Sequence, residues 1–264
     1  MPDKEERMSI LMHLDELRRR ILYCVVALTI GFGVCFNYSE DLLRWMMLPL
    51  TMTLNIKTQF PFFFATYSGQ TFKLTFLELT EPFWMHMKIA FVAGIFLALP
   101  FMLAQLWFFI SPGLLPKERK YLLPFVVSAT IMFVTGALFC QYFVLPFAIK
   151  FLLTYKTENL VQMITIGRYV DFVSKFLLAF GLVFELPLII TLLSRLGLVT
   201  PQFLARNRKY AILLAFVVAA VLTPTPDAFN QALMAAPIIV LYEVGIIMAR
   251  LVGKKKPAPA AQEE

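Results

Sequence analysis

Two carboxylates occupy positions where the edge of a membrane protein usually carries only positive charge. Glu16 lies in the segment His13-Leu-Asp-Glu-Leu-Arg-Arg-Arg20, and Glu118 lies in Pro112-Gly-Leu-Leu-Pro-Lys-Glu-Arg119. Each segment adjoins an apolar run, on the side that lysines and arginines mark as cytoplasmic. Two acidic groups on one side of a membrane predict a receptor site for a basic peptide.

A simpler interpretation of the same residues is a helix that leads into the first membrane span. Apolar residues repeat at three- and four-residue steps, while His13, Glu16 and Arg20 share the opposite face. The apolar set is Ile10, Leu14, Leu17 and Ile21. In this interpretation Glu16 only pairs with Arg20 at i,i+4, which contributes about 0.2–0.5 kcal/mol. Glu118 has basic residues on both sides and the same explanation.

The composition predicts a polytopic membrane protein. Hydrophobic residues make up 59% of the chain, charged residues make up 16%, and the mean hydropathy is +0.74. An average soluble domain is roughly 45–50% apolar and about 25% charged. The net charge of +7 does not indicate a nucleic-acid partner, because most basic residues cluster between apolar runs. The three cysteines form no CxxC pair, so neither a disulfide framework nor a metal site is indicated.

Six apolar runs are candidate membrane-spanning helices of one all-α domain, residues 1–253. They cover about 21–38, 83–110, 121–145, 169–195, 209–222 and 229–249, and a polar tail, 254–264, is expected to be disordered. Of the 24 lysines and arginines, 16 fall where six crossings with both termini inside would place the cytoplasm. The fifth run is short, about 21 Å at 1.5 Å per residue. A re-entrant hairpin made from the last two runs therefore stays open as an alternative.

Enzyme chemistry is not indicated. The chain has no GxSxG, HExxH, P-loop or dinucleotide fingerprint, and its two histidines are far apart. We therefore expect neither an enzyme nor a cofactor. Energy for any transport must come from a gradient or from partner proteins.

Four motifs, in order and spacing, resemble the TatC family, the multi-spanning receptor subunit of the twin-arginine protein translocase. They are His13-Leu-x-Glu-Leu-Arg18, then Gln105-x-Trp-x-Phe-x-x-Pro-Gly-Leu-x-x-x-Glu-Arg119, then Phe184-Glu-x-Pro187, and Thr225-Pro-Asp227 with Gln231. The resemblance implies six helices, both termini cytoplasmic, a concave glove-like arrangement and short fifth and sixth helices. It also implies an inner-membrane location and export of folded proteins driven by the proton-motive force. The implied partners are single-span TatA and TatB proteins, with several copies of the chain in the receptor complex.

The resemblance assigns Glu16 and Glu118 to recognition of the paired arginines of a signal peptide. A guanidinium forks onto a carboxylate through two parallel hydrogen bonds, a geometry that lysine cannot reproduce. Arg18 is expected to order the loop or to balance the acidic site rather than to bind the peptide directly. Phe109 and Pro112 are expected to shape the start of the loop that carries Glu118, with helix termination and packing as the alternative.

Glu185 lies inside the fourth apolar run, where a charge costs about +2.5 kcal/mol or more on insertion scales. Its side chain must face a cavity, be protonated or have a partner. The resemblance implies a place on the concave face that recruits TatA or TatB, with Pro187 kinking the helix. One alternative is a neutral carboxyl bonded to Ser or Thr of a neighbouring helix. Two other functions also stay open: a proton-coupled solute transporter that uses Glu185, and a scaffold without a ligand.

Three residues are assigned to the outer side by the resemblance. Asp227 and Gln231 match polar positions beside the last two helices, and Pro49 matches a position that shapes the outer cap. Asp227 has an alternative role as the N-cap of the sixth helix. Ala228 stands where many members of the family carry another proline, which leaves the geometry of this turn open.

Overall fold

The computed structural model describes residues 10–56, 63–67, 74–110, 122–154, 163–222 and 227–252. Its elements are nearly all helical. In chain order they are α1 (Ile10–Asn37), α2 (Ser39–Met46), α3 (Leu48–Thr51), β1 (Met52–Ile56), β2 (Phe63–Tyr67), α4 (Glu81–Ile110), α6 (Leu122–Phe139), the π-helical turn η2 (Cys140–Val144), α7 (Leu145–Thr154), α8 (Ile166–Phe184), α9 (Leu186–Arg195), α10 (Pro201–Arg206), α11 (Arg208–Leu222) and α12 (Ala228–Val252).

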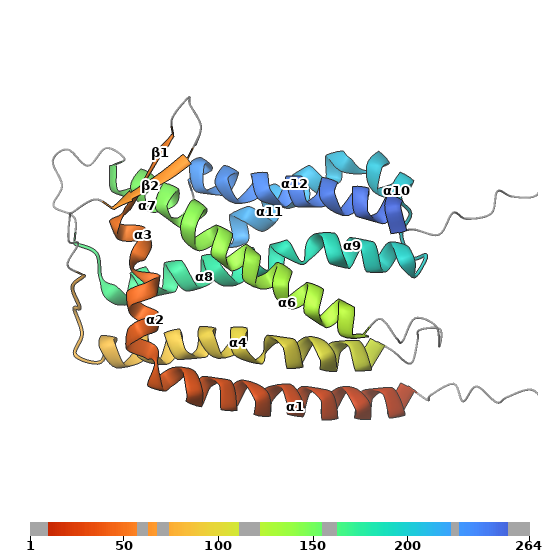
Figure 1. Ribbon diagram of the computed structural model, residues 1–264, viewed down its shortest axis with the longest axis horizontal. Helices are drawn as coiled ribbons and strands as arrows, with labels where there is room; N and C mark the ends of the chain where they lie inside the picture. Colours follow the sequence, from red (N-terminus) through yellow and green to blue (C-terminus); the bar gives the residue numbers. More distant parts are fainter. Residues whose placement is uncertain are drawn as a thin grey trace, which may run out of the picture.

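The long helices run lengthwise through the molecule, and the short elements cover its two ends (Figure 1). The start of α1 and the end of α12 lie at the same end of the bundle, together with α10. We call this end the inner end, because the predicted topology places it in the cytoplasm. At the opposite, outer end, α2 lies across the long helices, next to α3 and the hairpin of β1 and β2.

Five helical stretches among the described residues are long and apolar enough to cross a membrane. They are Met12–Asn37, Glu81–Ile110, Leu122–Thr154, Ile166–Arg195 and Ala228–Leu251. With 15 residues, or about 22 Å, α11 is the short fifth span that the sequence predicts. The expected all-α membrane architecture is confirmed, with six spans when α11 is counted. By contrast α12, which the resemblance implies to be short, has 25 residues.

The outer cap is joined to the bundle through the C-terminal carbonyl groups of α2. The last carbonyls of a helix have no partner within it, so a buried helix end needs donors from elsewhere. Gln141 Nε2 donates to the Trp45 carbonyl at 2.7 Å, and the Tyr169 hydroxyl donates to the Met46 carbonyl at 2.6 Å. Both donors come from long helices, so they fix α2 across the bundle. The sequence predicts a short helix here, around Glu40–Met47, but not the two-stranded hairpin that follows.

The glycines Gly31 and Gly94 allow α1 and α4 to touch. A Cβ atom added to Gly31 would lie 2.9 Å from the carbonyl oxygen of Gly94, and one added to Gly94 would lie 2.8 Å from the amide nitrogen of Phe32. The two helices run in opposite directions (Figure 1). Eleven residues, about three turns, separate Gly31 from Arg20 and also Gly94 from Gln105. Arg20 and Gln105 therefore face each other at the inner end of the same interface.

Replacing Gly94 with alanine should destabilise the protein. The new methyl group would meet backbone atoms of Phe32 that cannot rotate away, so the helices must separate, at a cost of about 1–3 kcal/mol. The measurement is the thermal unfolding midpoint of the purified protein. Gly33→Ala is the matched control, because nothing lies within 4 Å of its added Cβ atom. Equal midpoints for the two variants would contradict the proposed role of the crossing.

Candidate functional site

The inner ends of α1 and α4 hold a polar cluster made of Glu16, Arg20 and Gln105. Arg20 Nη2 donates to Glu16 Oε1 at 3.1 Å, and Arg20 Nη1 donates to Gln105 Oε1 at 2.9 Å. The side chains of Glu16 and Arg20 are only 16% and 22% exposed. The i,i+4 pair that the sequence offers as the simpler interpretation is thus present, and a contact to a second helix extends it. This carboxylate has a fixed position at the bundle edge.

Aromatic side chains of α4 hold the cluster in place. The guanidinium carbon of Arg20 lies 5.1 Å from the centre of the Phe108 ring, at a distance typical of a cation–π contact. Two turns nearer the N-terminus of α1, the His13 ring stacks on Phe109 with centroids 4.3 Å apart and 14° between the planes. These contacts attach the first turns of α1 to the last turn of α4. Phe109, expected to shape the loop start, is therefore placed against His13.

The polar face of α1 is the face that packs on the protein. Leu14 and Ile21, from the apolar set of the sequence, are exposed, whereas His13, Glu16 and Arg20 contact each other or α4. In a bilayer the lipid tails solvate apolar side chains, so polar side chains gather between helices instead. Amphipathicity indicates the helix correctly, but its apolar stripe is not the buried one.

The other predicted inner-side residues are only partly placed. Arg18 is exposed on α1, beside the equally exposed Arg19. Glu118 and Pro112 lie outside the described residues. The approach of the second carboxylate to Glu16 therefore stays a prediction.

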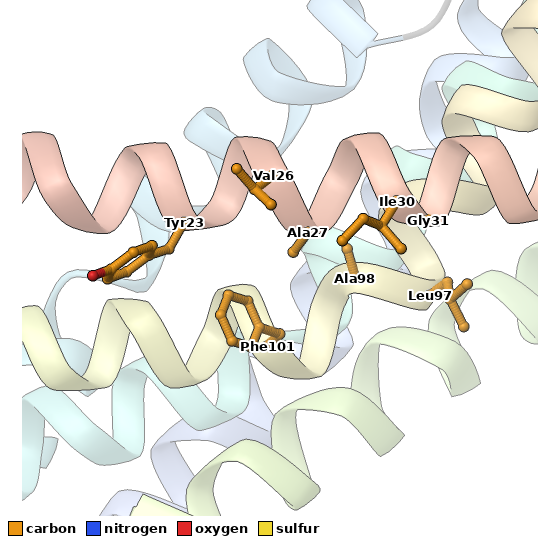
Figure 2. A pocket seen from close by; sticks show the side chains of 8 residues that line it. All are labelled: Tyr23, Val26, Ala27, Ile30, Gly31, Leu97, Ala98 and Phe101. Carbon is orange, nitrogen blue, oxygen red and sulfur yellow. The ribbon is translucent and has the colours of Figure 1, made fainter.

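An apolar cleft continues from the polar cluster along the same two helices (Figure 2). Its inner end begins one turn beyond Arg20, at Tyr23, and one turn before Gln105, at Phe101; both rings project into the gap between the helices. The cavity has a volume of about 410 Å³ and ends near Gly31. The small side chains of Ala27 and Ala98 leave this space open between the rings and the glycine crossing. Hydrocarbon or an apolar peptide side chain fits such a lining, and a polar ligand does not.

Glu185 occupies the break between α8 and α9. Its side chain is buried, and Oε1 has no hydrogen-bond partner among the described residues. The described residues therefore include no Ser or Thr that hydrogen-bonds to this oxygen, as the alternative interpretation would require. Leu182 and Ile189, one turn before and one turn after, are exposed. Pro187 lies in the first turn of α9, directly after the break at Glu185.

On the outer side, Asp227 and Gln231 make contacts that hold α11 and α12. Asp227 Oδ1 accepts the backbone N–H of Asn230 at 2.7 Å, and Oδ2 accepts the side-chain amide of Asn230 at 2.9 Å. Gln231 Nε2 donates to the carbonyl of Phe216 in α11 at 3.0 Å. The N-cap alternative for Asp227 is thus present in the structure. Pro49 is fully buried in the first turn of α3, in the outer cap.

Sequence reasoning did not select Gln105 and Arg20 as site residues, nor the ion pair of Lys88 with Asp171. Gln105 is a buried amide inside an apolar helix. A polar residue within an otherwise apolar run could have been selected from the sequence as a candidate contact between helices. Lys88 Nζ lies 2.7 Å from Asp171 Oδ1, joining α4 to α8 near the outer end. In the described part of the chain no group of three or more His, Cys, Asp or Glu residues could hold a metal ion.

Comparisons with known proteins give one consistent result. The family model described as Sec-independent protein translocase protein (TatC) matches residues 12–237. A protein of this description from Koribacter versatilis is 42% identical over 261 residues, which is 97% of this chain and 92% of the relative. Another, from Carboxydothermus hydrogenoformans, is 39% identical over 253 residues, covering 96% and 97%. The solved structure titled "Crystal Structure of Twin Arginine Translocase Receptor- TatC" is 34% identical, with a TM-score of 0.75, and covers 91% of this chain and 99% of that chain.

Replacing Asp227 with alanine should remove a helix cap. Losing this acceptor typically costs about 0.5–2 kcal/mol, so the free energy of unfolding should fall by that amount. Asp227→Asn keeps an oxygen that can accept the Asn230 N–H and should lose much less. The comparison is made by thermal unfolding of the purified variants. An asparagine variant as unstable as the alanine variant would count against the cap.

Proposed function

The chain belongs to the Sec-independent protein translocase protein (TatC) family, and from this premise we propose that it is the receptor of the twin-arginine translocase, which binds the signal peptide of folded cargo at its inner end. The observation that carries the proposal is Glu16, a carboxylate fixed at the edge of the bundle by Arg20 and the aromatic frame of α4. A preorganised carboxylate loses little conformational freedom when it binds a cation.

The paired arginines of the peptide would bind two carboxylates. Glu16 takes one guanidinium, and Glu118, at the family position in the next inner loop, takes the other. Two parallel N–H to O bonds on each carboxylate distinguish arginine from lysine. Arg18, exposed on α1, balances the acidic charge.

The apolar stretch of the peptide would follow the arginines into the membrane. The cleft between α1 and α4 begins one turn from the polar cluster and offers it the first apolar surface. The peptide then reaches the concave face beside Glu185, whose unpartnered carboxyl oxygen would turn outward to make a polar contact with the single-span partners TatA and TatB. Their assembly, driven by the proton-motive force, opens the bilayer, and the short α11 thins it locally.

The proposal places the protein in the cytoplasmic membrane, with both termini inside and several copies in the complex. The inner clustering of both described chain ends supports this topology (Figure 1). The two competing functions receive less support. A solute transporter would use Glu185 alone and leave the inner cluster without a role, and a scaffold would use neither.

Replacing Glu16 with glutamine should abolish the preference for arginine. In membrane vesicles, we expect photocrosslinks between an Arg-Arg signal peptide and the wild-type protein, a much weaker signal with a Lys-Lys peptide, and a loss of about tenfold or more in Glu16→Gln. The matched control is Asp15→Asn, which removes the same charge from an exposed neighbour. Equal crosslinking of both peptides to the wild-type protein would overturn the receptor function.

Replacing Glu185 with leucine should separate peptide binding from partner recruitment. Leucine fills a similar volume without a buried polar group, so the fold should be retained. Peptide crosslinks should persist, while peptide-dependent crosslinks to TatA and TatB should fall to background. Ser194→Ala is the control, because it removes another buried polar group from α9. Undiminished recruitment in Glu185→Leu would refute the proposed partner contact.

A further inference from the structure

The receptor carboxylate is already occupied in the structure. Oε1 of Glu16 accepts a hydrogen bond from the guanidinium of Arg20, and each of the two side chains is more than three-quarters buried. A peptide arginine approaching Glu16 therefore meets a neutral pair rather than a free carboxylate. It must either share the carboxylate with Arg20 or displace it.

Arg20 has an anchor that does not depend on Glu16. Its second terminal nitrogen, Nη1, donates to Gln105 Oε1 at 2.9 Å, and its guanidinium lies on the Phe108 ring. Gln105 is itself buried, so its oxygen is held in place. When Glu16 is taken by another cation, Arg20 keeps two contacts on α4 and need not leave the site.

Among the described residues of α1 and α4 around the pair, there is no second buried carboxylate. The last three turns of α4, from Phe101 to Ile110, carry no acidic residue, and Asp15 on α1 is exposed. Arg18 and Arg19 follow on α1, both exposed. Among the described residues, Glu16 is the anion that Arg20 contacts, and the local excess of positive charge disfavours a weakly bound cation.

We propose that Arg20 is a resident guanidinium, which occupies Glu16 in the empty receptor and, when a peptide arginine binds, gives up Glu16 and keeps only its contacts with Gln105 and Phe108. The proposal rests on the function proposed above and adds a specificity-determining residue to it. A ligand binds only if it holds the carboxylate at least as well as Arg20 does. A forked guanidinium meets this condition, and a lysine ammonium, with a single point contact, does not.

The test is the apparent dissociation constant of labelled Arg-Arg and Lys-Lys signal peptides for the full-length protein in proteoliposomes. Arg20→Met removes the competitor and should tighten binding of the Arg-Arg peptide about three- to tenfold. The Lys-Lys peptide should gain more, so the ratio of the two affinities should fall. Arg19→Met is the matched control: it removes an exposed charge that does not contact Glu16 and should leave the ratio unchanged.

A second variant is expected to act in the opposite direction. Gln105→Leu takes away the acceptor that holds Arg20 independently of Glu16, so Arg20 should depend more on Glu16 and the Arg-Arg peptide should bind several-fold more weakly. This variant keeps the charge of the site, and it decides the question if Arg20→Met does not fold. Tighter binding in Gln105→Leu, weaker binding in Arg20→Met, or an unchanged ratio in Arg20→Met would overturn the resident guanidinium.

Glu16→Gln separates the two hypotheses. If it binds both peptides as the wild type does, the receptor function proposed for Glu16 fails. If it loses the Arg-Arg peptide while Arg20→Met keeps the wild-type ratio, the receptor function stands and only the role of Arg20 fails.

Discussion

The close contact of Gly31 with Gly94 sets the register of α1 against α4, and the inner site depends on that register. Lipid tails are as apolar as the helix surfaces, so burial alone gives two helices in a bilayer little reason to choose one alignment. Backbone contact at one crossing removes this freedom. Three turns nearer the inner end, Arg20 meets Gln105. The apolar cleft lies between these two contacts of α1 with α4.

The opposite end of the bundle follows a different rule. There the long helices end, and the backbone groups at a buried helix end have no partner within the helix. Each of them needs a hydrogen-bond partner from elsewhere in the chain. Gln141 and Tyr169 supply donors to the end of α2, and Asp227 caps the start of α12. Outer polar residues that look like candidates for binding thus stabilise helix ends and helix contacts, whereas the inner cluster links side chains to one another.

Much of the architecture could be predicted from hydropathy, because crossing a membrane demands about 20 apolar residues whatever the fold. The short α11 followed from its length, and the pair of Glu16 with Arg20 followed from its spacing. Two features could not be predicted. The face of α1 that packs inward depends on which neighbour it meets, and the pairing of Arg20 with Gln105 joins residues 85 apart in the chain. The hairpin was missed for a different reason: β1, Met-Thr-Leu-Asn-Ile, alternates apolar and polar residues, but five residues are a short signal and β2, Phe-Phe-Ala-Thr-Tyr, does not alternate.

The two carboxylates inside this molecule differ in whether the protein satisfies them. Glu16 has an internal partner, Arg20, so under the proposed function binding there would be an exchange. Glu185 has a buried oxygen for which the described residues supply no partner, so a polar group brought by another chain would remove a penalty rather than replace a bond. In an exchange, a ligand binds only if it holds the Glu16 carboxylate at least as well as the Arg20 guanidinium does. An unsatisfied oxygen favours association with any suitable donor. In the proposed receptor, discrimination between ligands and assembly with partners would use two separate carboxylates, Glu16 on α1 and Glu185 at the break between α8 and α9.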